Sequence, residues 1–256
     1  MVLSFSGGTR KQEHDRQLAL LLMLESKVRR KMFNALMEVT RLVSDDQYYE
    51  LGRIRTQYLL ENIFEMDGIL RKHYQTTIYS FALNNLRNLN KKQRRKLPNR
   101  FDMRVSEFIR TQALQQAQLI GDTTQEDLRG IIDQATSKGL GVSETAKAIR
   151  EQGEVFARAR AETIAITETH NAAMFGNFYS AKDLSDEYEI KTRKEWISTF
   201  DARTREEHAA ANGQVVDMDE AFIVGGERMM YPGDPAASAA NVIRCRCVLG
   251  YVVSEE

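Results

Sequence analysis

Apolar positions recur every three or four residues over most of the first two thirds of the chain, which predicts long amphipathic helices. The first such stretch covers about 9–43 and the second about 46–89, and neither contains proline. Gly68 is the expected weak point of the second helix. A short polar turn between the two stretches predicts a helical hairpin. The pattern breaks at 91–100, where Pro98 disfavours helical geometry at the preceding residue.

Shorter helices are expected after this break. They are separated by glycines or by polar capping residues, and they cover 102–119, 124–138, 143–149 and 155–178. Gly121 is expected to stop the first of them, and Gly139 the second. Alanines are frequent in the last of these helices, which gives it a face of small residues that permits close packing.

From about residue 185 the pattern changes to short alternating or β-branched runs. Strands are expected at 195–199, 221–224 and 247–253. The predicted fold class is therefore α+β and predominantly α-helical, with a long N-terminal helical hairpin followed by a compact C-terminal domain of helices packed on a small antiparallel sheet. The corresponding domains are a hairpin arm with a basic end at 1–100, a helical connector at 101–150 and the C-terminal domain at 151–256.

Composition supports a soluble globular protein. The chain has 256 residues, of which 42% are hydrophobic and 28% charged. No apolar run approaches the roughly 20 residues that cross a bilayer, and the N-terminus lacks the apolar core of a signal peptide, so we expect neither secretion nor a membrane role. Cys245 and Cys247 are separated by one residue, a spacing that suits reduced thiols or metal ligands better than a disulfide.

Charge is unevenly distributed although it sums to zero. Residues 1–100 hold 19 Lys and Arg against 10 Asp and Glu, which gives +9, whereas 151–256 hold 11 against 19, which gives −8. The densest basic run comprises Lys91, Lys92, Arg94, Arg95 and Lys96. Such a run could contact nucleic acid or an acidic portal or capsid surface, and it could also be a solvated helix face.

The last hundred residues contain three segments that are rich in charged, small and otherwise rare residues at fixed places. They are RAETIAITETHNAA from Arg160, KEWISTFDARTREEH from Lys194, and YPGDP followed by NVIRCRC. In this order and spacing they resemble the phage head-morphogenesis family, the minor capsid proteins similar to protein F of phage Mu, over roughly 140–252. The motif positions to which we assign a structural role are Arg160, Thr167, Glu168, Trp196, Asp201, Arg203, Thr204, Tyr231, Pro232, Asp234 and Arg246.

This resemblance implies a structural minor head protein of a tailed bacteriophage. Such a protein is incorporated during head assembly through contacts with the portal or the inner capsid, and it can aid DNA packaging or ejection. The implied partners are the portal protein, the major capsid or scaffolding protein and double-stranded DNA, with no membrane in the assembled head. The implied location is the head interior or portal vertex of the virion, reached from the host cytoplasm during assembly.

The resemblance also suggests a metal site, because many relatives carry a DxRTCxxC motif and a later histidine before CRC. This chain departs from that pattern, since Arg205 and His208 stand at the two cysteine positions. His208, Cys245 and Cys247 remain as zinc ligands, with His170 or Asp201 as a fourth. The alternative is that no cofactor is bound, both cysteines are small buried hydrophobes and the histidine is simply hydrogen-bonded.

The remaining motif residues have structural interpretations. Asp201 is expected to be the N-cap of a helix through His208. Arg203 or Arg246 is expected to form a buried bidentate pair with Glu168 or Asp234. YPGDP predicts a turn in which proline fixes φ, glycine takes positive φ and aspartate bonds back to the chain.

Catalysis is not expected. A ribonuclease could be assembled from His170 or His208 with Glu168 and Arg203, and a cysteine hydrolase from Cys245 or Cys247 with His208. Neither arrangement is accompanied by a nucleophile elbow, an HExxH motif or a signature of a catalytic cysteine. We therefore predict a structural protein, with a DNA-binding head protein as the first alternative and a nuclease or other hydrolase as the second.

Overall fold

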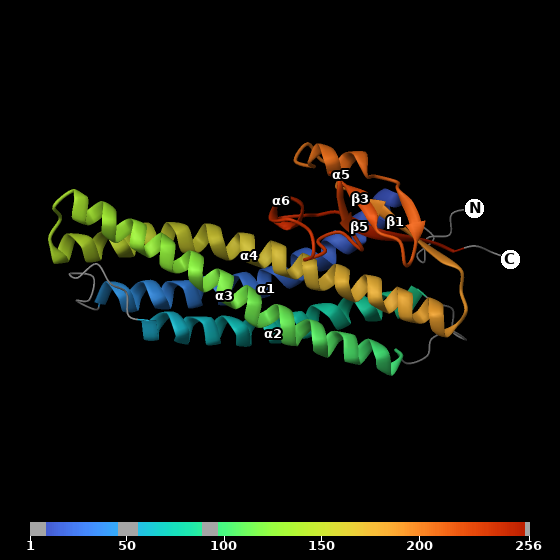
Figure 1. Cartoon of the computed structure of the whole chain (residues 1–256), viewed down its shortest axis with the longest axis horizontal. Coiled ribbons are helices and arrows are strands. Elements are labelled where there is room, and N and C mark those ends of the chain that lie inside the picture. Colours follow the sequence, from blue (N-terminus) through green and yellow to red (C-terminus); the bar gives the residue numbers. More distant parts are fainter. Residues whose placement is uncertain (1–8, 46–55, 89–96, 254–256) are drawn as a thin grey trace. The chain divides into compact units, whose positions relative to one another are not determined.

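The computed structural model describes residues 9–45, 56–88 and 97–253. Four long helices come first and short strands follow (Figure 1). In chain order the elements are α1 (Arg10–Asp45), α2 (Thr56–Asn88), α3 (Asn99–Ser137), α4 (Val142–Glu187), β1 (Thr192–Ile197), α5 (Glu206–Ala210), β2 (Val215–Asp217), β3 (Phe222–Val224), β4 (Glu227–Met229), α6 (Ala239–Val242) and β5 (Val248–Val253). The predicted α+β fold class, with long N-terminal helices and a small antiparallel sheet, is confirmed.

The contacts divide the chain into two compact units. One, which we call the sheet unit, contains Met1–Glu25, Tyr74–Glu107 and Ile166–Glu256, and the other, the helical unit, contains Ser26–His73 and Phe108–Ala165. Each of the four long helices contributes residues to both units. Neither unit corresponds to a single one of the segments 1–100, 101–150 and 151–256, and whether those segments fold independently stays a prediction.

Two of the predicted helix breaks are wrong. α3 continues through Gly121, and α4 is one helix where we expected two. A Cβ on Gly121 would lie 2.6 Å from the Ile63 side chain, and one on Gly153 would lie 2.3 Å from the Thr40 side chain. These glycines serve the close approach of neighbouring helices, so they do not end a helix. The end predicted at Gly139 is confirmed, because α3 ends at Ser137 and Gly139, two residues later, takes a φ of +66°.

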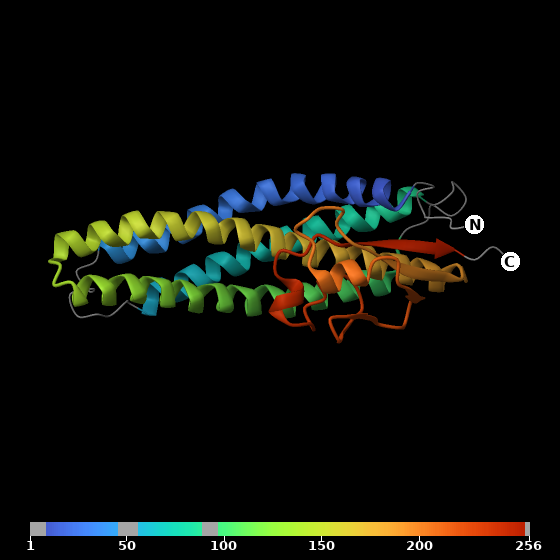
Figure 2. The same cartoon turned by 90° about the horizontal axis from the view of Figure 1, so that it is seen from above.

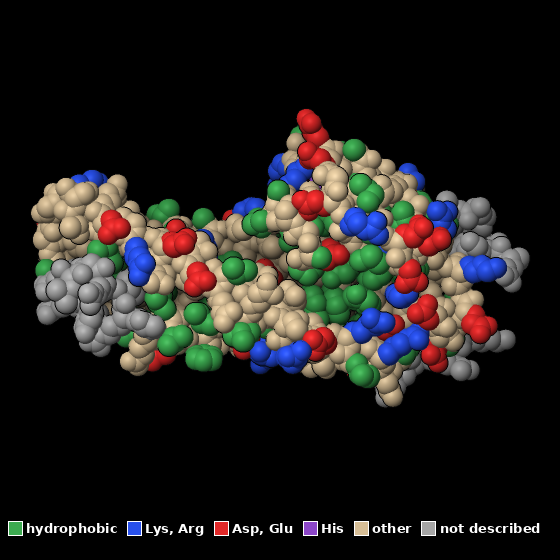
Figure 3. All heavy atoms as spheres, viewed as in Figure 1, with side chains coloured by type: hydrophobic (Ala, Val, Ile, Leu, Met, Phe, Trp, Pro, Cys, Tyr) green, Lys and Arg blue, Asp and Glu red, His purple; other side chains and the backbone are tan. Residues whose placement is uncertain are grey.

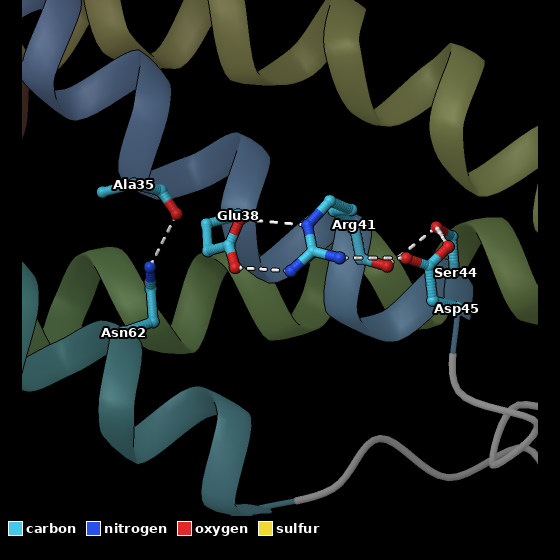
Figure 4. Close-up of polar contacts among 6 residues, drawn as sticks. All are labelled: Ala35, Glu38, Arg41, Ser44, Asp45 and Asn62. Atoms are coloured by element: carbon cyan, nitrogen blue, oxygen red, sulfur yellow. Dashed lines mark hydrogen bonds and ion pairs between the residues drawn. The ribbon is translucent and has the colours of Figure 1, made fainter.

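The core of the helical unit joins all four long helices. Its buried residues are Val39, Val43, Leu59, Leu128, Ile131, Ile132, Ala146 and Ile149. Polar contacts also cross between the helices of this unit: the Asn62 amide of α2, for example, donates to the Ala35 carbonyl of α1 at 2.9 Å (Figure 4). On the surface of α1, Arg41 donates to both Glu38 and Asp45, which are three and four residues away (Figure 4). Such surface pairs contribute little, so apolar packing holds this unit together.

The strands of the sheet unit form a three-stranded sheet in the order β2-β1-β5 and a separate β3-β4 hairpin, all antiparallel. β1, β3 and β5 lie close to the predicted strands. β2 and β4, of three residues each, were not predicted. β5 lies beside α1 and α4 (Figure 2). The Gln17 amide of α1 donates to Leu249 O at 2.8 Å, and the Tyr251 hydroxyl donates to Asn177 O of α4 at 3.0 Å.

Charged side chains of both signs are interspersed on the face of the molecule that Figure 3 shows. Hydrophobic side chains gather in a hollow of this face next to the C-terminal strands. Within the described ranges, none of the helices combines the length and the apolar character that a membrane span requires.

Gly176 sets the distance between α2 and α4 in the sheet unit. A Cβ at this position would lie 2.5 Å from the backbone oxygen of Ile78 and 2.8 Å from its Cα. Because these are backbone atoms, no side-chain rotation can relieve the clash, and the two helices would have to separate.

We therefore expect Gly176→Ala to lower the free energy of unfolding by about 1–3 kcal/mol, as other overpacked cores do. Gly130→Ala is the matched control, since this glycine lies in α3 with no atom within 4 Å of the added Cβ. The control should raise stability by about 0.5–1 kcal/mol through helix propensity. Urea unfolding of both variants measures the difference, and equal effects of the two substitutions would contradict the close packing.

Candidate functional site

The part of α4 that belongs to the sheet unit is buried on nearly all sides. From Ile166 to Ser185 every side chain is buried except those of Tyr179 and Lys182, which are half-buried. Many of the buried side chains are nevertheless polar: Thr167, Glu168, Thr169, His170, Asn171, Asn177, Ser180, Asp183 and Ser185. Buried polar groups need hydrogen-bond partners, so these residues specify what must pack around the helix.

Three of these side chains hold the irregular C-terminal segment. Thr167 Oγ1 accepts from the backbone N–H of Arg244 at 3.1 Å, and the His170 Nε2–H donates to Cys247 O at 2.7 Å. In the amide orientation that satisfies its neighbours, Asn171 donates to Gly233 O at 3.0 Å. Arg244 has a φ of +56°, a left-handed conformation that costs energy for a residue with a side chain, and the bond to Thr167 helps to fix it.

Glu168 is paired with Tyr74 of α2. The Tyr74 hydroxyl donates to Glu168 Oε2 at 2.5 Å, and both side chains are buried. Burial raises the pKa of Glu168 from 4.5 to about 7, and the Tyr74 hydrogen bond opposes this rise. Burial and the nearby carboxylate raise the pKa of Tyr74 well above its ordinary value. The pair is thus best satisfied with one proton on the tyrosine and another on the glutamic acid.

The YPGDP segment forms the predicted kind of turn. Asp234 accepts from the backbone N–H of Met230 at 2.8 Å and from that of Ala236 at 3.0 Å, and Gly233 takes a φ of +76°. A Cβ on Gly233 would lie 2.4 Å from His170 Nδ1, so the turn packs directly on α4. Pro232 is buried, and the ring of Tyr231 lies 5.5 Å from that of Phe178.

The loop after β1 differs from our expectation. α5 begins at Glu206 with Arg205 at its N-cap, and no side chain caps it, so the prediction of an Asp201 cap is wrong. Asp201 instead accepts from the Arg203 backbone and guanidinium within the loop. The Arg203 side chain is 91% exposed, which excludes it from a buried pair. Thr204 Oγ1 closes the loop by donating to Thr199 O at 2.7 Å.

Arg246 forms a bidentate pair that is partly buried, but with a partner that we did not predict. Both guanidinium nitrogens of Arg246 bind Glu25 of α1, rather than Glu168 or Asp234. Glu25 lies between Leu24 and Val28 on the buried face of α1. A carboxylate on such a face is the sequence signal that could have revealed the pair, although the sequence alone does not name its partner.

Trp196 is fully buried beside the ring of His208, at 5.6 Å between centroids. Lys194, two residues earlier on β1, is also fully buried and was not predicted. Its Nζ donates to Met230 O at 2.8 Å and lies 4.5 Å from the centre of the Phe178 ring. Burial lowers the pKa of Lys194 to about 8.

His208, Cys245 and Cys247 converge inside the sheet unit. Their ligand atoms all lie within 4.8 Å of one another, and all three residues are buried. His208 Nδ1 is 3.3 Å from Cys247 Sγ and 3.7 Å from Cys245 Sγ. Burial disfavours the Cys245 thiolate, but Cys247 and the imidazoles of His170 and His208 favour it more strongly and lower its pKa. The interaction with Cys245 raises the pKa of Cys247.

Neither residue that we considered as a fourth ligand belongs to this group in the described part of the chain. His170 uses Nε2 for Cys247 O, and its Nδ1 faces Gly233. Asp201 is occupied by Arg203 in an exposed loop.

The other sequence candidates lie elsewhere. Arg160 belongs to the helical unit, where it pairs with Asp127 at 3.3 Å and donates to Ile120 O. The basic run Lys91, Lys92, Arg94, Arg95 and Lys96 lies outside the described residues.

The Glu168 pKa predicts a pH dependence of stability. Because the folded state holds this proton more tightly than the unfolded state, the free energy of unfolding should fall as pH rises from about 4.5 to about 7. The loss amounts to about 3 kcal/mol and is complete above pH 7.

Glu168→Gln keeps an acceptor for Tyr74 but cannot ionise, so this component of the pH dependence should disappear. Urea unfolding at pH 5 and pH 8 measures it. Glu187→Gln, at the exposed end of the same helix, is the control and should follow the unmodified protein. An equal pH dependence in all three proteins would refute the assignment.

Comparisons with known proteins agree on the C-terminal half. Residues 126–250 match the family model described as Phage Mu protein F like protein. The chain is 32% identical to the minor head protein GP7 of Bacillus phage SPP1 over 127 residues, which are 49% of this chain and 40% of that protein. It is 27% identical to the uncharacterized protein YqbB of Bacillus subtilis strain 168 over 157 residues, 60% of this chain and 50% of that one.

A third relative is described as an NAD(+)--arginine ADP-ribosyltransferase, EFV, of Enterococcus faecalis. It is 31% identical over 119 residues, which are 45% of this chain and 23% of the relative. The chain thus spans half or less of the length of the curated relatives it matches. No solved structure is significantly similar to it. Residues 126–250, just under half of the chain, are thus similar to the Phage Mu protein F like proteins.

Proposed function

We propose that this protein is a structural minor head protein of a tailed bacteriophage, incorporated during head assembly by binding the portal or the inner capsid wall. The observation that carries the proposal is the match of residues 126–250 to the phage family together with the similarity to the minor head protein of phage SPP1. The major capsid or scaffolding protein and the packaged DNA are further proposed partners, and the virion head is the proposed location.

We propose no catalytic role. The polar motif residues of α4 are engaged in contacts that hold the fold: Thr167 with Arg244, Glu168 with Tyr74 and His170 with Cys247. The transferase relative shares 23% of its length with this chain, so its printed activity belongs to a much longer protein. A structural module is the simplest role for a region that a head protein and part of a transferase both match.

For docking we propose the exposed apolar face of α2 in the helical unit. Phe64 exposes 69% of its surface and Leu60 exposes 49%, and the two lie one helical turn apart. Large apolar side chains on a rigid helix are suitable anchors for a groove in a partner protein. Exposure at this level also means that replacing them leaves the core unchanged.

Co-expression with the portal protein of the same phage, followed by sizing at low and high salt, tests this proposal. A complex that survives high salt is expected, because apolar contacts are not screened. The double variant Leu60→Ser with Phe64→Ser should weaken the complex at least about tenfold, as the loss of interface anchors does. Val155→Ser is the matched control, since Val155 is 71% exposed on α4. No complex with portal, capsid or scaffolding protein would contradict the proposed function, whereas equal weakening by the control would contradict the docking face alone.

The charge pattern of α1 supports contact with double-stranded DNA as a second candidate function. Lys27, Arg29, Arg30 and Lys31 are all exposed. In the described ranges, no carboxylate lies within ion-pair distance of these four side chains. Unpaired cations on a helix can neutralise phosphates and release counterions from DNA. The run at 91–96 adds five further positive charges to the same half of the sequence.

DNA binding should therefore weaken linearly with the logarithm of salt concentration. Replacing Lys27, Arg30 and Lys31 by Gln should reduce the slope by about 3, one unit for each lost phosphate contact. Replacing the exposed Arg129, Lys138 and Arg228 by Gln removes the same charge elsewhere and should leave the slope nearly unchanged. The slopes come from fluorescence anisotropy with a DNA duplex between 50 and about 200 mM salt. Absence of binding at low salt would remove this candidate.

A further inference from the structure

Three potential ligand atoms from separate parts of the sheet unit meet in one buried place. His208 comes from α5, whereas Cys245 and Cys247 come from the segment that leads into β5. All three residues are at most 2% exposed, and their ligand atoms lie within 4.8 Å of one another. We propose that these residues form a zinc site that ties α5 to the start of β5.

The distances fit zinc coordination. With Zn–S bonds of about 2.3 Å and Zn–N bonds of about 2.0–2.1 Å at tetrahedral angles, a ligand nitrogen and a ligand sulfur are about 3.5 Å apart. His208 Nδ1 lies 3.3 Å from Cys247 Sγ and 3.7 Å from Cys245 Sγ. The two observed distances fall on either side of the expected one. A two-thiolate, one-imidazole set also suits zinc better than calcium or magnesium, which prefer oxygen ligands.

The histidine is held in the orientation that a metal ligand needs. Its Nε2–H donates to Asn241 Oδ1 at 3.2 Å, and Asn241 in turn donates to Val224 O at 3.5 Å. With the proton on Nε2, the lone pair of Nδ1 points at the two sulfurs. Metal-binding histidines commonly donate their second nitrogen in this way, which fixes both tautomer and ring orientation.

The indole of Trp196 packs against the His208 ring, at 5.6 Å between the ring centroids. The indole N–H of Trp196 is buried and has no acceptor among the described groups. A buried N–H without an acceptor costs free energy, and an anionic sulfur beside it would lower that cost. Zinc-bound cysteine supplies that anion.

The three side chains leave one position of a tetrahedron open. His170 and Asp201 do not reach it, for the reasons given above. A solvent molecule would complete the coordination, as it does at other sites with three protein ligands. Zinc would link α5 to the segment before β5 without a disulfide, which matches the two free cysteines.

The test uses the full chain without a histidine tag, because such tags bind zinc themselves. After expression in zinc-supplemented medium and exhaustive dialysis, elemental analysis should find about one zinc ion per chain. Stepwise modification of the two thiols by a mercurial should release this zinc in proportion, followed with a chromophoric chelator. Cobalt substitution should produce a sulfur-to-cobalt charge-transfer band. The thiol titration is made on the unmodified protein and does not depend on whether any variant folds.

Variants then assign the ligands. His208→Gln and the double change Cys245→Ser with Cys247→Ser should each reduce the zinc content to less than about one tenth per chain. His14→Gln is the matched control, since His14 is also buried and hydrogen-bonded, to Arg246 O, but lies outside the ligand group. The proposal fails if the folded protein neither holds nor takes up zinc. It also fails if zinc stays after both thiols are modified, or if the double cysteine variant retains it.

Discussion

The structure of the sheet unit depends on one constraint, which is that the second half of α4 is buried while it carries many polar side chains. A helix satisfies its own backbone, so these side chains are free to bind groups of other segments. The segment from 229 to 247 has little regular structure, and several of its peptide groups need partners from outside. Thr167 supplies an acceptor to Arg244, and His170 supplies a donor to Cys247. The polar motif of α4 and the irregular C-terminal segment are thus two halves of one hydrogen-bonding system.

The same constraint extends to the N-terminal helices of this unit. Glu168 meets Tyr74, and Arg246 meets Glu25. Removal of either partner would leave a buried polar group without its hydrogen bond, which costs more than the bond contributes when both are present. Residues from α1 and α2 are therefore structural parts of the unit that contains the C-terminal strands. The idea of a hairpin arm at 1–100 has to accommodate these contacts.

Predictions from the sequence succeeded where a pattern of apolar residues indicates which positions are buried. The apolar periodicity predicted α1 and α2, and β-branched content predicted β1 and β5. It failed at Gly121, because a glycine that admits a neighbouring helix has the same letter as one that ends a helix. At the candidate site the motif residues could be named, since unusual polar residues stand out from an amphipathic background. Their partners could not, because Glu25 and Arg246 are 221 residues apart and nothing in one segment encodes the register of the other.

The match to the phage family begins at residue 126, yet several buried groups within it are completed from outside it. Tyr74 donates to Glu168, Glu25 accepts from Arg246, and Gln17 accepts from the Asn177 amide at 2.9 Å. A protein that shared only the family region would have to satisfy these groups with other partners. The family region therefore contributes a set of buried polar side chains, and the preceding helices contribute the hydrogen-bond partners of these side chains. This is a physical reason to treat the residues of α1 and α2 that make these contacts as part of the same folded unit, and to test the proposed assembly function on the whole chain.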